Sequence, residues 1–129
     1  WSENIRLWNR SIPGDVVIDN WLSGEEYPQN IVRKSFNTSF KIELDCEKRS
    51  IEKIKEYNLP VNIEEYIQQA NAYIWAYKLM PKIRKWFVPG KGPYSVPELW
   101  TKMPKTFNVN YHQMPKKIEK LYMKHCFSN

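Results

Sequence analysis

The stretch NIEEYIQQANAYIWAYKLM, residues 62–80, decides the fold that we predict for this chain. Its apolar side chains recur at intervals of three and four residues, the spacing that places them on one face of a helix. Two glutamates in the first turn suit the helix dipole. We therefore predict a long central helix over residues 62–80 that is capped by Asn62. The apolar face contains Ile63, Tyr66, Ile67, Ala70, Ile74 and Tyr77, and the opposite face contains Glu64, Glu65, Gln68, Gln69 and Asn71.

A pattern of period two precedes this helix. Phe40, Ile42, Leu44 and Cys46 alternate with charged residues, as in a half-buried strand. Residues 31–36 supply a second apolar run across a turn at residues 37–39. We predict an antiparallel β-hairpin over about residues 31–46, packed on the central helix because two strands alone are only marginally stable. The predicted fold class is α+β, a mainly helical single domain.

Several shorter helices are predicted from their caps and prolines. Pro81 either kinks the central helix or begins a new segment, since proline is tolerated in a first helical turn. The run from Val88 to Pro93 must be a loop because it holds two prolines and two glycines. The predicted short helices cover residues 2–8, 15–24, 50–58, 81–87, 95–100 and 115–125.

The length of 129 residues is typical of one domain, residues 1–129. The sequence begins with Trp1, so we expect a processed form or a piece of a longer chain. Cys46 and Cys126 are the only cysteines, and this scarcity favours an intracellular protein. The alternative that we retain is a secreted mature form with a Cys46–Cys126 disulfide.

Charge divides the chain into two unequal parts. Residues 1–77 lean acidic, with nine basic and twelve acidic side chains and a net charge of −3. Residues 78–129 are strongly basic, with eleven basic and two acidic side chains and a net charge of +9. Such asymmetry favours a polyanionic partner. The basic part is also rich in Trp and Tyr, which is typical of a folded surface and not of a disordered tail.

Our leading functional prediction is sequence-independent nucleic-acid binding by this basic part, to RNA or DNA. Lysines dispersed among aromatics supply charge for phosphates and flat faces for bases. The preference for lysine over arginine argues against reading of bases. Trp86 and Tyr94 are the stacking candidates. The candidate phosphate contacts are Lys82, Arg84, Lys85, Lys91, Lys102, Lys105, Lys117, Lys120 and Lys124.

A protein-interaction module is the alternative prediction, as a viral or assembly component. Its basic face and its exposed tryptophans would bind an acidic or apolar partner protein. Trp75 lies off the apolar face of the central helix, and an exposed Trp often marks a binding hot spot. In the simpler interpretation, Trp75 packs under the N-terminal segment and the lysines are merely solvated. Membrane binding is not favoured, because the basic amphipathic segments 81–88 and 115–126 are too short or have too narrow an apolar face.

No catalytic, cofactor or metal site is predicted. Cys46, His112, His125 and Cys126 lack the spacing of a structural zinc site. Both histidines fall in the acid-poor part of the chain, and no serine lies in a G-x-S-x-G turn. The sequence therefore favours a protein that binds over an enzyme.

Overall fold

The computed structural model describes residues 4–7 and 10–129. The described chain is mainly helical, and a short antiparallel pair of strands precedes the helices. The elements are β1 (Asn4–Leu7), β2 (Arg10–Pro13), α1 (Gly14–Leu22), α2 (Gln29–Glu56), α3 (Ile63–Ile83), the 3-10 helix η1 (Pro93–Ser95), α4 (Pro97–Trp100) and α5 (Lys116–His125).

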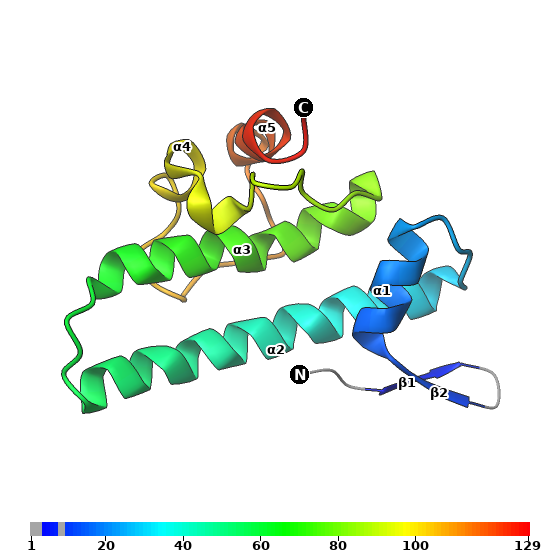
Figure 1. The fold of residues 1–129 in the computed structure, drawn as a ribbon, viewed down its shortest axis with the longest axis horizontal. Coiled ribbons are helices and arrows are strands. Elements are labelled where there is room, and N and C mark those ends of the chain that lie inside the picture. The colour runs from blue at the N-terminus through cyan, green and yellow to red at the C-terminus, as the bar shows by residue number, and fades with distance from the viewer. Residues whose placement is uncertain (1–3, 8–9) are drawn as a thin grey trace.

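Helix α3 is the centre of the molecule, as Figure 1 shows. The long helix α2 packs along one side of it, and η1 and α4 pack on the other side. Helix α5 lies in the same outer layer as α4. Helix α1 packs on α2, and both β2 and β1 contact this helical pair. The basic C-terminal part of the chain thus forms an outer layer over α3.

Small residues allow α3 to be covered on both sides. Ala70, Ala72 and Ala76 are the chain's only alanines, and all three lie buried in α3. A side chain of one methyl group lets neighbouring segments approach a helix closely while it keeps the highest helix propensity. The alanines thus give the C-terminal layer room to pack against α3.

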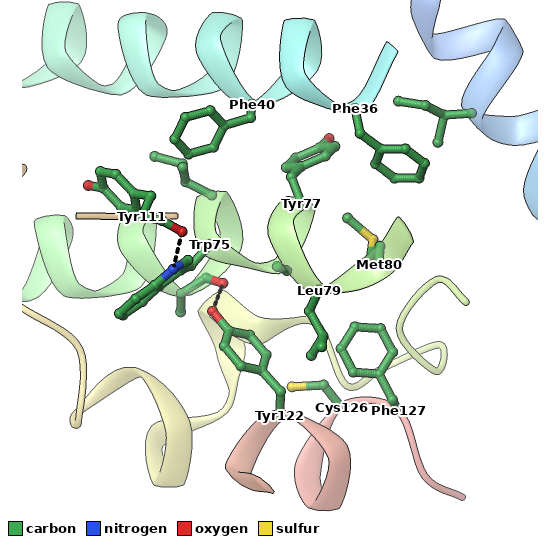
Figure 2. Close-up of a cluster of buried hydrophobic side chains, with 14 of the residues drawn as sticks. Phe36, Phe40, Trp75, Tyr77, Leu79, Met80, Tyr111, Tyr122, Cys126 and Phe127 are labelled. Atoms are coloured by element: carbon green, nitrogen blue, oxygen red, sulfur yellow. Dashed lines mark hydrogen bonds between the residues drawn. The ribbon is translucent and has the colours of Figure 1, made fainter. Parts of the chain in front are cut away.

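Aromatic side chains fill the space between the layers (Figure 2). Phe40 of α2 packs edge-on against Tyr111, with ring centroids 5.3 Å apart. Trp75 of α3 packs against the same Tyr111 ring at 5.9 Å, and its indole N–H donates to the Tyr111 carbonyl oxygen at 3.0 Å. The buried hydroxyl of Tyr122 in α5 donates to the carbonyl of Ala72. These contacts join α2, α3 and the C-terminal layer into one core.

The predicted polar face of the central helix is wrong at two positions. Gln68 and Asn71 are buried, because each holds the backbone of the irregular segment that follows α4. The Asn71 amide donates to the carbonyls of Pro104 and Thr106, both at 2.9 Å. The Gln68 amide donates to the carbonyls of Thr101 and Met103 at 3.2 and 3.0 Å. The two amides satisfy backbone carbonyls that secondary structure does not pair.

The predicted hairpin over residues 31–46 is wrong, because these residues lie within the single helix α2. The α+β class rested on that hairpin and fails with it, whereas the mainly helical character is confirmed. The buried positions of α2 follow a helical spacing that the alternation at residues 40–46 conceals. They are Ile31, Val32, Ser35, Phe36, Phe40, Ile51 and Ile54. Packing against α1 and α3 therefore overrides the local strand pattern.

The shorter elements were predicted with mixed success. The helix over residues 2–8 is wrong, because Asn4–Leu7 is a strand that pairs with Arg10–Pro13; its Trp8 lies outside the described residues. Ser50 caps no helix, since it lies inside α2 and donates to the Cys46 carbonyl at 3.1 Å. Pro81 lies inside α3, so no separate helix begins there.

The remaining helices were predicted at nearly their observed positions. The Asn62 side chain caps α3 by accepting from the Glu65 N–H at 3.1 Å. Helices α1, α4 and α5 match the predicted segments 15–24, 95–100 and 115–125 to within a few residues. Prolines and caps thus located the element boundaries that do not depend on distant contacts.

Candidate nucleic-acid interface

Helix α5 carries a row of lysines along a groove. Lys116, Lys120 and Lys124 are spaced four residues apart, so they lie on one side of the helix and about 6 Å apart along its axis. They line a groove of about 570 Å³ together with Glu119, Met123 and Ser128. All three lysines are exposed. The groove therefore presents three positive charges and one negative charge to solvent.

The chain leading out of α3 meets α5 at the end of this groove. The Val88 N–H donates to the Cys126 carbonyl at 2.8 Å. The Lys91 amine donates to the carbonyl of the groove residue Ser128 at 2.7 Å. Lys91 thus adds a fourth cation beside the C-terminal end of α5.

The lysines of α5 form no ion pair with any residue that the structure describes. The ion pairs formed within the described residues are Asp45–Arg49, Lys53–Glu56 and Glu26–Arg84, and none includes a lysine of α5. Lys116 and Lys117 moreover occupy the first turn, where the helix dipole disfavours positive charge. Helix stability therefore does not account for their presence.

Lys116 was not among the predicted contacts, although its spacing of four from Lys120 could have identified it. Lys117, which was predicted, is exposed on α5 but does not line the groove. Lys120 and Lys124 do line it. The structure thus brings together two of the predicted lysines with one that the prediction missed.

The Arg84 side chain is engaged in contacts within the fold, so it is poorly placed to bind a ligand. Its guanidinium donates to the Trp21 carbonyl at 2.9 Å, to the Glu26 carboxylate at 2.9 Å and to the Glu25 carbonyl at 3.2 Å. The same group lies over the Trp21 ring, 4.6 Å from its centroid. Arg84 therefore fastens the end of α3 to α1 and the loop after it.

The other predicted basic residues are exposed but lie outside the groove. Lys82 is in the last turn of α3, and Lys85 follows it. Lys102 and Lys105 are in the segment between α4 and α5. They add positive charge to the basic part of the chain without lining the groove.

The two predicted stacking residues do not line the lysine groove. Trp86 is 39% exposed and packs on Phe87, with ring centroids 4.7 Å apart. Tyr94 is 50% exposed, but its ring lines a different cavity, beside the carboxylates of Glu43 and Glu47. Negative charge beside Tyr94 disfavours an approaching phosphate. The groove itself is therefore suited to phosphate contact without stacking.

Trp75 is buried, so the exposed position predicted for it is wrong. Only 4% of its surface is accessible, and its indole N–H is bonded to Tyr111 as described above. It packs under the C-terminal segment, and the simpler reading that placed it under the N-terminal segment is therefore also wrong. Trp75 stabilises the core and offers no surface to a partner.

A second basic cavity, of about 260 Å³, lies between α2 and the end of α3 and includes Arg33, Lys78 and His112. The Lys78 amine donates to the Asn37 side chain at 3.3 Å and lies over the Phe40 ring, 4.1 Å from its centroid. Burial lowers the pKa of Lys78, and the nearby charge of Lys41 lowers it further. Lys78 thus interacts with α2 and is not part of the α5 groove.

Cys46 and Cys126 are free thiols, so the disulfide considered for a secreted form is not formed. Within the described residues no three His, Cys, Asp or Glu side chains are arranged to hold a metal ion. None of the helices described for this chain combines the length and the apolar character needed to cross a bilayer. Comparison with models of protein families, with curated proteins and with solved structures gives no match to this chain.

Proposed function

We propose that this protein binds the phosphate backbone of nucleic acids, without reading sequence, through the lysine groove of α5. The row formed by Lys116, Lys120 and Lys124 is the observation that carries the proposal. Regularly spaced cations along a groove suit a chain of regularly spaced phosphates. Binding gains free energy from the counterions that each neutralised phosphate releases.

The surroundings of the groove support a backbone contact over recognition of bases. Lysine is a point charge that does not make the paired hydrogen bonds by which arginine reads guanine. Among the described residues, no aromatic ring lines the groove, and Met123 is the one apolar side chain that does. Little discrimination among sequences is therefore expected.

Fluorescence anisotropy with a labelled oligothymidine of about 15 nucleotides tests the proposal. The triple variant Lys116→Gln, Lys120→Gln, Lys124→Gln should bind at least about tenfold more weakly at low salt, because three phosphate contacts are lost. The matched control is Lys41→Gln, Lys48→Gln, Lys55→Gln, which removes the same charge from exposed positions of α2.

Equal losses in the two triple variants would show that only net charge matters and would overturn the assignment to the groove. Failure of the parent protein to bind oligothymidine or duplex DNA at low salt would overturn nucleic-acid binding altogether. A labelled polyglutamate peptide is the competing ligand. Tight binding of that peptide alone would assign the groove to an acidic protein partner.

A further inference from the structure

A cavity of about 470 Å³ lies away from the lysine groove, where α2, α3 and the segment after α3 meet. Glu43 and Glu47 reach it from α2, and Tyr66 and Tyr73 reach it from α3. Phe87 and Tyr94 close it from the segment after α3. The volume falls within the range of small-ligand sites.

The aromatic wall of this cavity is held in place. The Tyr73 ring packs against Phe87 at 6.4 Å and Tyr94 at 5.9 Å between centroids. The Tyr94 ring lies directly on Gly92, where an added Cβ would come within 3.0 Å of a ring carbon. Glycine at position 92 therefore lets this exposed ring pack closely against the backbone beside the cavity.

The carboxylates give the cavity its charge. Glu43 and Glu47 are one helical turn apart on α2, and among the residues that the structure describes no lysine or arginine lines the cavity. Among the residues that the structure describes, neither carboxylate forms an ion pair. Burial raises the pKa of Glu43, and the nearby charge of Glu47 raises it further. A positive ligand would relieve the repulsion between these two carboxylates.

We propose that this cavity binds an organic cation, an ammonium or guanidinium head that carries alkyl groups. The positive head would lie near Glu43 and Glu47, and its alkyl groups would lie against the faces of Tyr73, Phe87 and Tyr94. Aromatic faces attract cations within about 6 Å, and the attraction grows when water is excluded. A bare metal ion is not favoured at this site, because no group of three His, Cys, Asp or Glu side chains among the described residues could hold one.

Two sources could present this chemistry: a free small amine, or a lysine or arginine side chain of a partner peptide. Choline and the peptide Gly-Gly-Lys-Gly-Gly represent them in an NMR titration of the full chain. The neutral control is 3,3-dimethyl-1-butanol, which has the shape of choline without its charge. We expect choline, the peptide or both to shift the ring signals of Tyr73 and Tyr94, and the neutral alcohol to bind at least about tenfold more weakly.

The double variant Glu43→Gln, Glu47→Gln should weaken that binding at least about tenfold. Its matched control is Glu52→Gln, Glu56→Gln, which removes two exposed carboxylates at the same spacing on the same helix. Both variants retain the residues of the lysine groove, so oligonucleotide binding is tested independently.

Three outcomes would overturn the proposal. In the first, neither cation shifts the signals of the cavity. In the second, the neutral alcohol binds as well as choline, so charge has no role. In the third, the two double variants lose binding equally, which would assign the effect to net charge. Stronger binding of the peptide would identify a partner side chain as the source, and stronger binding of choline would identify a free amine.

Discussion

Single buried polar residues hold the irregular part of this structure in place. Asn71 donates two hydrogen bonds to backbone carbonyls and accepts one from the Tyr111 hydroxyl. Burial raises the pKa of Tyr111 to about 12, so its hydroxyl stays protonated and able to donate at neutral pH. One amide thereby orders two stretches of the segment between α4 and α5.

Replacing Asn71 with alanine should lower the free energy of unfolding by about 2 to 4 kcal/mol, because two part-buried carbonyls and the buried Tyr111 hydroxyl lose their partner. Urea denaturation measures the change. Asn30→Ala, at an exposed position of α2, is the control and should change stability by less than about 0.5 kcal/mol. Equal effects of the two substitutions would contradict the anchoring role of Asn71.

Cys126 is a second residue whose surroundings decide its behaviour. Its side chain is completely buried, and burial raises the pKa of the thiol to about 11. Near pH 8 the thiolate that reacts with disulfide reagents is therefore scarce and inaccessible. A Cys46→Ser variant, which retains only Cys126, should react with Ellman's reagent in denaturant but hardly at all when folded. Rapid reaction of the folded protein would place Cys126 at the surface.

At the scale of elements, helix α2 marks the limit of what the sequence could predict. Caps and prolines are local signals, and they located α4, α5 and the start of α3. In α2, the alternation from Phe40 to Cys46 and the turn-forming residues 37–39 both favour a hairpin locally. Tertiary contacts of α2 with α1 and α3 stabilise the helix instead. These contacts come from residues distant in the sequence. Burial of Gln68 and Asn71 was missed for the same reason, because their partners lie more than thirty residues away.

Two proline substitutions distinguish a continuous helix α2 from a hairpin with its turn at residues 37–39. Thr38→Pro should cost about 3 kcal/mol or more, because proline removes a hydrogen bond inside a helix and clashes with the preceding turn. Gln29→Pro, at the first position of α2, should be tolerated. Thermal unfolding followed by circular dichroism compares the two. A harmless Thr38→Pro would contradict the continuous helix.

At the scale of the molecule, the fold determines where the basic and acidic residues of the chain lie on its surface. The basic part covers one side of α3, and three of its lysines form the row along the α5 groove. Glu43 and Glu47 of the acidic part instead share a cavity with Tyr94, which the sequence analysis predicted as a stacking residue for nucleic-acid bases. Composition could predict that the charges separate. It could not predict which lysines converge, because that depends on how α5 and the residues after α3 meet.

The salt dependence of oligothymidine binding tests the role of the α5 groove most directly. For three phosphate contacts to a single strand, log K should fall with log salt with a slope of about −2. The variant Lys116→Gln, Lys120→Gln, Lys124→Gln should bind weakly and lose most of this slope, whereas the control with substitutions at residues 41, 48 and 55 should keep it. An unchanged slope in the α5 variant would contradict phosphate binding in the groove.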